Sequence, residues 1–145
     1  MIIVSECLLG VNCKYSGGNN ENLKVIEFLK NKNYCAVCPE QLGGLSTPRL
    51  PSEIKSDRVY SKEGKDITRE FELGRDRALK IIKEKEKELS EPVEMAILKA
   101  KSPSCGSNII YDGSFSGKKI AGNGIFVRAL KEKGIPVFTE NDIFE

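Results

Sequence analysis

Five cysteines and no histidine define the chemistry that this sequence of 145 residues can support. Without histidine, one chain cannot build a Ser-His-Asp or Cys-His catalytic site, and it cannot bind zinc through imidazole. A metal would instead need thiolate, carboxylate or backbone ligands. Acid–base catalysis would fall to Glu, Asp, Lys, Tyr or Cys side chains.

Three of the cysteines each follow a short apolar segment that is typical of a buried strand. They are Cys7 after residues 2–4, Cys38 after residues 34–37 and Cys105 after residues 95–98. Because the carboxyl ends of parallel strands lie at one edge of a sheet, we expect the three thiols to meet there. Three thiolates around one metal centre leave a coordination position open, as in catalytic metal sites. Soft thiolate ligands favour either zinc or an iron–sulfur cluster.

The other two cysteines have different interpretations. Cys35 forms a CxxC motif with Cys38, but the motif lies in a predicted strand, where residues three apart point to opposite faces. We therefore predict that Cys35 is a core residue and not half of a redox pair. Cys13 lies in the loop after Cys7, where it could be a fourth ligand, a thiol that acts on the substrate, or an inert loop residue.

Polar residues next to these cysteines are candidates for catalysis. Glu40 follows Cys38 by two residues and is the leading acid–base candidate, although it could also be an exposed loop carboxylate. Ser102 and Ser104 precede Cys105. Ser102 could hold a substrate carbonyl or a water molecule, and either hydroxyl could instead only cap the loop backbone.

A group of glycine, asparagine and basic residues could bind a phosphate or a polar ring. The glycines Gly17 and Gly18 and the following Asn19 precede a predicted helix, and helix N-termini attract anions. The basic candidates are Lys14, Arg49 and Lys101. The glycines match neither a P-loop nor a dinucleotide fingerprint.

The order of predicted elements indicates an α/β fold. Strands at residues 2–4, 34–37, 95–98 and 136–138 alternate with helices that begin near residue 19 or 20, at residue 68 and near residue 123. This order predicts a Rossmann-like, mainly parallel sheet of about four strands with helices on both faces. A small β-hairpin insertion is expected over residues 54–67, with its turn at residues 63–65. The Gly- and Pro-rich segment 40–51 argues against a helix there.

The composition is that of an ordinary globular protein of one domain, residues 1–145. Hydrophobic residues make up 39% and charged residues 30%, and the net charge of +2 is too small to predict general binding to polyanions. No segment is long and apolar enough for a membrane span, and residues 1–6 do not form a signal peptide. Free cysteines without an export signal lead us to expect a cytoplasmic protein.

Four blocks of the sequence, at residues 5–10, 14–19, 38–49 and 101–106, resemble the DUF523 family, whose characterised members are thiouracil desulfurases. The resemblance implies a [4Fe-4S] cluster held by Cys7, Cys38 and Cys105, with one iron left free to take the sulfur of a thiocarbonyl. The implied reaction is a non-redox hydrolysis, in which C=S becomes C=O and sulfide leaves.

The resemblance also implies roles for other residues. Glu40 and Ser102 match positions that the family uses in catalysis, and Cys13, which some relatives lack, is predicted to be catalytic and not a ligand. The expected substrate contacts are Lys14, Tyr15, Gly17, Gly18, Asn19, Arg49 and Ser104. Ser16 departs from the Asp of many relatives, which affects the fine contacts to the substrate.

The expected substrate is a small thiolated pyrimidine, either a base such as thiouracil or a 4-thiouridine nucleotide. Larger relatives that act on tRNA carry an additional C-terminal domain, so tRNA is not the expected partner here, and neither is a membrane. The alternative is a non-catalytic metal- or iron–sulfur-binding module, such as a thionucleotide sensor or a sulfur carrier.

Overall fold

The computed structural model describes residues 1–142, and its centre is a parallel sheet with the strand order β2-β1-β5-β8. The strands are β1 (Ile2–Ser5), β2 (Tyr34–Val37), β5 (Met95–Leu98) and β8 (Val137–Thr139). β1 pairs in parallel with both β2 and β5, and β5 pairs in parallel with β8. The carboxyl ends of all four strands therefore lie at one edge. The predicted α/β fold with a mainly parallel sheet of four strands is confirmed.

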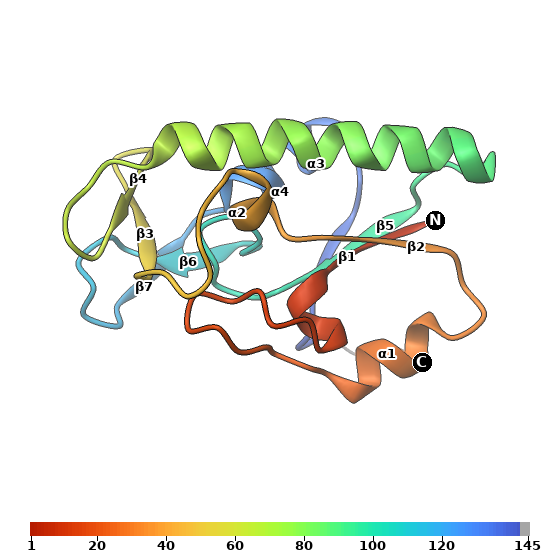
Figure 1. Cartoon of the computed structure of the whole chain (residues 1–145), viewed down its shortest axis with the longest axis horizontal. Helices are drawn as coiled ribbons and strands as arrows, with labels where there is room; N and C mark the ends of the chain where they lie inside the picture. Colours follow the sequence, from red (N-terminus) through yellow and green to blue (C-terminus); the bar gives the residue numbers. More distant parts are fainter. Residues whose placement is uncertain (143–145) are drawn as a thin grey trace.

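Helices cover both faces of this sheet (Figure 1). The long helix α3 (Thr68–Leu89) and α4 (Ile125–Glu132) cover one face, while α1 (Leu23–Leu29) and the short 3-10 helix η1 (Glu6–Leu9) cover the other. The alternation of side chains in β1 explains this arrangement, because Ile3 packs toward α3 and α4 whereas Ile2 and Val4 pack toward α1.

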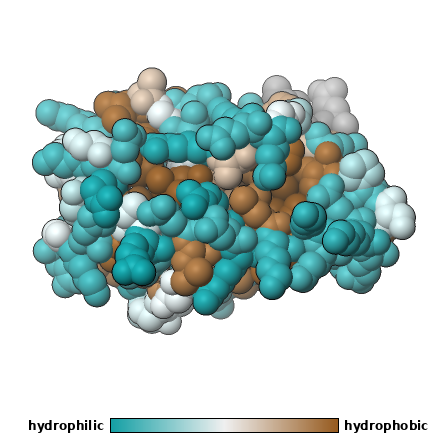
Figure 2. Space-filling view, turned by 90° about the horizontal axis from the view of Figure 1, so that it is seen from above, coloured by the Kyte–Doolittle hydropathy of each residue, from teal (hydrophilic) through white to brown (hydrophobic). Residues whose placement is uncertain are grey.

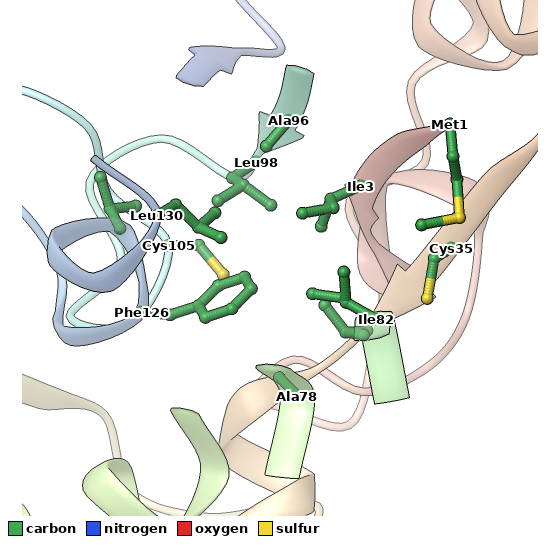
Figure 3. Packing of buried hydrophobic residues seen from close by; sticks show 12 residues of the cluster. Met1, Ile3, Cys35, Ala78, Ile82, Ala96, Leu98, Cys105, Phe126 and Leu130 are labelled. Atoms are coloured by element: carbon green, nitrogen blue, oxygen red, sulfur yellow. The ribbon is translucent and has the colours of Figure 1, made fainter. Parts of the chain in front are cut away.

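The cluster on the α3 and α4 face contains two of the five cysteines. Figure 3 shows Cys35 beside Met1 at one end of this cluster and Cys105 beside Phe126 at the other. Cys38 instead packs against the cluster on the opposite face of the sheet. The prediction that Cys35 is a core residue facing away from Cys38 is therefore confirmed.

Two antiparallel hairpins extend one end of the molecule, at the left of Figure 1. They pair β3 (Ser52–Lys55) with β4 (Arg58–Ser61), and β6 (Ile109–Tyr111) with β7 (Lys119–Ala121). The predicted insertion is present, but β3 and β4 reverse at Ser56 and Asp57, both at positive φ, and not at residues 63–65. The turn at residues 63–65 exists as a second reversal that leads into α3, closed by the hydrogen bond from Ser61 N to Lys65 O at 2.9 Å.

The helix boundaries agree with the sequence except at two places. α3 spans the predicted residues, but α1 starts later than expected, because the side chain of Asn22 accepts the N–H of Val25 at 3.1 Å and caps the helix. The short helix α2 (Pro39–Leu42) lies where no helix was predicted. Pro39 occupies its first position, where a missing N–H is harmless, and Cys38 is the N-cap residue.

The surface over α3 is mainly hydrophilic. In the view from above, hydrophilic residues cover most of this face, with hydrophobic patches between them (Figure 2). Leu73 and Ile81 are the large hydrophobic side chains of α3 that remain exposed. Within residues 1–142, no helix combines the length and the apolar character that a membrane span requires.

Candidate active site

A cavity of about 540 Å³ is lined by residues that follow the carboxyl ends of β1, β2 and β5. Four of the five cysteines line it, each from a different segment. Cys7 lies in η1 just after β1, Cys38 lies at the N-cap of α2 just after β2, and Cys105 lies in the loop after β5. Cys13 comes from the loop between η1 and α1. Short connections from neighbouring parallel strands thus bring thiols distant in sequence to one place.

Cys13 lies between Cys7 and Cys38. Its thiol is within hydrogen-bonding reach of both, and this contact is the main cause that lowers the pKa of Cys7 to about 7 and also lowers the pKa of Cys38. The same two contacts raise the pKa of Cys13, which is 1% exposed. The arrangement favours thiolates at Cys7 and Cys38, the form that binds metals, and a protonated thiol at Cys13.

Cys105 is also buried, and burial dominates the properties of its thiol. The pKa of the Cys105 thiol is raised to about 12, mainly by burial and in part by the nearby charges of Cys7 and Cys38. The hydroxyl of Ser104 lies 3.6 Å from the Cys105 sulfur, and this contact partly offsets the rise in pKa. Three thiolates in one cavity repel one another, so a bound cationic centre would stabilise all three.

The loop that carries Cys105 is fixed by the beginning of α4. The backbone N–H groups of Phe126 and Val127 both donate to the carbonyl of Ser104, at 3.1 and 3.3 Å. These are N–H groups that the first turn of a helix cannot satisfy internally. A Cβ atom on Gly124 would lie only 2.4 Å from the Ser104 carbonyl, so glycine is needed for this close approach. The position of Cys105 is therefore set by helix capping.

A chain of hydrogen bonds joins Glu40 to the Cys105 loop. The Oε2 atom of Glu40 accepts from the Ser104 hydroxyl at 3.1 Å, and the Ser102 hydroxyl lies 3.0 Å from that of Ser104. Ser102 Oγ also accepts the backbone N–H of Cys105 at 2.8 Å. On its other side, Glu40 Oε1 lies 3.2 Å from Arg49 Nε. The predicted acid–base residue and both predicted serines thus belong to one network beside the thiols.

The predicted substrate contacts fall into two groups. Lys14, Tyr15, Arg49 and Ser104 line the cavity, as does the basic candidate Lys101. The residues that line it do not include Gly17, Gly18 or Asn19. The expectation that these three residues open a helix is wrong, because α1 begins at Leu23 and Asn19 instead donates to the side chain of Asn12 at 2.9 Å.

Sequence reasoning missed the residues in and next to the two hairpins that line the cavity, among them Lys62, Tyr111 and Phe115. Phe115 has a φ of 55°, a conformation uncommon outside glycine, and its backbone N–H donates to Glu53 at 3.1 Å. No local pattern marks these residues, since they reach the cavity only through the packing of the hairpins beside the sheet.

The charges around the cavity leave three lysines without a carboxylate partner among residues 1–142. These are Lys14, Lys62 and Lys101, whereas Lys99 pairs with Glu140 at 2.9 Å and Arg49 pairs with Glu40. A cavity with unpaired ammonium groups attracts an anionic ligand.

The thiols suit a cluster better than a single ion. In the described part of the chain, no three Cys, Asp or Glu side chains are arranged to ligate one metal ion. A single zinc ion would need its thiolates within about 2.3 Å of one point. Soft thiolates from separate loops around one cavity are the donors that iron–sulfur clusters take. The donor set therefore fits an iron–sulfur cluster.

Comparison with known proteins agrees with this conclusion. Residues 2–142 match the family described as 2-thiouracil desulfurase. The chain is 38% identical over 153 residues to the uncharacterized protein YbbK of Bacillus subtilis (strain 168), covering 99% of this chain and 97% of that protein. It is also similar to a solved structure described as a [4Fe-4S]-dependent thiouracil desulfidase TudS (DUF523Vcz), with a TM-score of 0.83 and 38% identity over 97% of this chain and 90% of that chain.

Proposed function

Because the chain belongs to the 2-thiouracil desulfurase family, we propose that it removes the sulfur of a thiolated pyrimidine by hydrolysis at an iron–sulfur cluster. The observation that carries the proposal is that Cys7, Cys38 and Cys105 line one cavity together with Glu40. The match extends over residues 2–142, which contain all of these residues.

We propose Cys7, Cys38 and Cys105 as the ligands of a [4Fe-4S] cluster. Such a cluster, when bound through three cysteines, would supply an iron without a protein ligand, a Lewis acid for the sulfur of the thiocarbonyl. Two features support this ligand set. The lowered pKa values of Cys7 and Cys38 favour the ligating thiolate form, and the similar solved structure is described as [4Fe-4S]-dependent.

The proposed reaction adds water to the ring carbon and releases sulfide, so that C=S becomes C=O without net transfer of electrons. Glu40 would take the proton from the attacking water oxygen and return it when the sulfur leaves. Its Oε2 atom is held by the Ser104 hydroxyl, and its Oε1 atom faces Arg49. A carboxylate fixed at both oxygens presents its remaining lone pairs in a constant direction, which favours proton transfer.

The serines and Cys13 would assist through hydrogen bonds. Ser102 accepts the backbone N–H of Cys105, which leaves its own O–H free to donate to Ser104 or to the substrate oxygen. Cys13 retains its proton between Cys7 and Cys38. We propose that this S–H donates to sulfur in the site, a role that makes Cys13 catalytic without being a ligand.

For the substrate, the unpaired lysines favour a nucleotide over a free base. Lys14, Lys62 and Lys101 would bind a phosphate, and Tyr15 would contribute an apolar contact from the cavity wall. A cavity of about 540 Å³ is within the range that accepts a small organic ligand. Contacts of Gly17, Gly18 and Asn19 with the substrate remain predictions.

Turnover under anaerobic conditions tests the proposed function. Reconstituted protein is incubated without reductant with 2-thiouracil, 4-thiouracil or 4-thio-UMP, and sulfide and the desulfurated product are quantified. We expect equal amounts of both products over many turnovers. Tight binding without sulfide release would support the binding-module alternative, and a protein that takes up no iron would contradict the proposal.

A further inference from the structure

Arg49 is the most completely bonded side chain beside the cavity. Its Nε atom donates to Glu40 Oε1 at 3.2 Å, and its Nη2 atom donates to the carbonyl of Cys13 at 2.9 Å. Its Nη1 atom donates to the carbonyl of Ser46 at 3.2 Å and to the hydroxyl of Thr47 at 2.9 Å. The side chain is 8% exposed, so water does not compete effectively for these bonds.

The number of these bonds limits what else Arg49 can do. A guanidinium group has five N–H donors, and four of them have acceptors within the protein. At most one N–H remains for a substrate, which is less than the two parallel bonds with which arginine usually recognises a phosphate. Most N–H donors of this side chain are therefore bonded to the protein and not to a ligand.

The partners of Arg49 come from separate segments of the site. Glu40 lies in α2, directly after Cys38, whereas Cys13 lies in the loop between η1 and α1. The backbone N–H of Arg49 also donates to the carbonyl of Tyr15 at 2.7 Å, so both the main chain and the side chain of Arg49 hold residues 13–15. Arg49 therefore ties the Cys13 loop to the proposed proton carrier.

We propose that Arg49 is a positioning residue that fixes the Glu40 carboxylate and the Cys13 loop in one arrangement. This inference rests on the proposed function for the role of Glu40, but the attachment of the Cys13 loop does not depend on it. Without the guanidinium group, the Oε1 atom of Glu40 loses its only charged partner among the described residues, and the carbonyl of Cys13 keeps only the long contact from the Cys38 thiol at 3.8 Å. The carboxylate would then turn toward solvent and residues 13–15 would move more freely.

Lysine cannot reproduce this arrangement in full. Its ammonium group is a single point of charge and cannot reach Glu40, Thr47 and the Cys13 carbonyl at the same time. Arg49→Lys should keep the charge near Glu40 but lose the attachment of the loop, whereas Arg49→Met should lose both. A matched control is Arg77→Met, because Arg77 also donates to a carbonyl at the end of α2, that of Leu42 at 2.7 Å, but does not line the cavity.

The first measurement is the rate at which iodoacetamide alkylates Cys13, followed by mass spectrometry in the full chain before and after anaerobic reconstitution. Cys35, buried in the core at 6% exposure, is the internal reference. We expect the rate at Cys13 relative to Cys35 to rise about tenfold in both Arg49 variants and to stay at the wild-type value in Arg77→Met. An unchanged rate in both Arg49 variants would overturn the proposal.

The second measurement separates kcat from KM for 4-thio-UMP and 4-thiouracil, at equal iron content. We expect Arg49→Met to lower kcat on the order of a hundredfold for both substrates with little change in KM, and Arg49→Lys to recover about tenfold of that loss. A loss confined to KM for the nucleotide would overturn the proposal in favour of a phosphate contact. An inactive wild-type protein would instead contradict the proposed function, and the alkylation rates would still test the attachment of the loop.

Discussion

The hydroxyl of Ser104 donates to Glu40 at a distance of 3.1 Å, across 64 positions of the sequence. Glu40 belongs to the short helix after β2, and Ser104 directly precedes Cys105 in the loop after β5. The same serine hydroxyl lies 3.6 Å from the Cys105 sulfur. One hydroxyl group thus links the proposed proton carrier to one of the proposed metal ligands.

Replacing Glu40 with glutamine tests the proton transfer. Glu40→Gln keeps the shape of the side chain and an oxygen for the Ser104 hydroxyl, but an amide cannot take a proton from water. We expect kcat to fall on the order of a hundredfold or more with unchanged iron content. The control is Glu53→Gln, since Glu53 also lines the cavity but its side chain accepts the backbone N–H groups of Gly113 and Phe115. Glu40→Gln with wild-type kcat would remove the acid–base role.

A pair of cysteine variants tests which thiols bind iron. Cys105→Ser should lose most of the iron and labile sulfide after anaerobic reconstitution, because serine is a much poorer ligand for a soft metal centre. Cys35→Ser should keep the wild-type iron content, although burying a hydroxyl in the core should lower the unfolding free energy by about 1–3 kcal/mol. Iron and sulfide assays, with urea unfolding as the stability measurement, distinguish the two. Equal iron loss in both variants would show that the loss reflects instability and not ligation.

Two glycines allow α2 to touch α3, and replacing one of them tests how α2 is held. A Cβ atom on Gly74 would lie 1.9 Å from the carbonyl oxygen of Pro39, and one on Gly43 would lie 2.0 Å from that of Glu70. Gly74→Ala must therefore push α2 away from α3. We expect a loss of about 3 kcal/mol in unfolding free energy, together with reduced iron binding because Cys38 is the N-cap of α2.

The control for this variant is Lys80→Ala, at an exposed position of the same helix. Alanine is a strong helix former, so this change should leave stability within about 0.5 kcal/mol of wild type. Thermal or urea unfolding followed by circular dichroism measures both variants. If Gly74→Ala were as stable as Lys80→Ala, the contact between α2 and α3 would not position Cys38 as described.

The unpaired lysines lead to a prediction about the substrate. Lys62→Gln should raise KM for 4-thio-UMP about tenfold, because a charged hydrogen bond to phosphate is lost, and should leave KM for 4-thiouracil nearly unchanged. High salt should weaken nucleotide binding in the wild-type protein and less so in the variant. Lys24→Gln, at an exposed position of α1 outside the cavity, is the control. An equal effect on base and nucleotide would argue against phosphate binding at Lys62.

The sequence predicts the sheet and its ligand-bearing edge because both depend on local patterns. Short apolar segments such as residues 2–4 and 95–98 are typical of buried strands, and their order along the chain specifies a parallel sheet. The cysteines follow these segments directly, so their meeting in one cavity follows from the topology.

Other features depend on contacts that no local pattern carries. Helix α2 was missed because its segment is rich in Gly and Pro. Pro39 is compatible with this helix because it occupies the first position, directly after the N-cap residue Cys38. Lys62 and Phe115 line the cavity because two hairpins, distant in the sequence, lie together beside it, as the hydrogen bond from Phe115 N–H to Glu53 shows. The network of Arg49 also joins distant segments, and a substrate contact was the only role that its charge suggested.

The central claim is that Cys7, Cys38 and Cys105 together bind one four-iron cluster whose fourth iron has no protein ligand. A crystal structure of the anaerobically reconstituted protein, with an anomalous difference map recorded at the iron edge, tests it most directly. We expect iron positions within bonding distance of these three sulfur atoms and one further iron that faces Glu40 without contacting Cys13. A cluster with Cys13 as a fourth ligand, or a single metal ion among the cysteines, would contradict it.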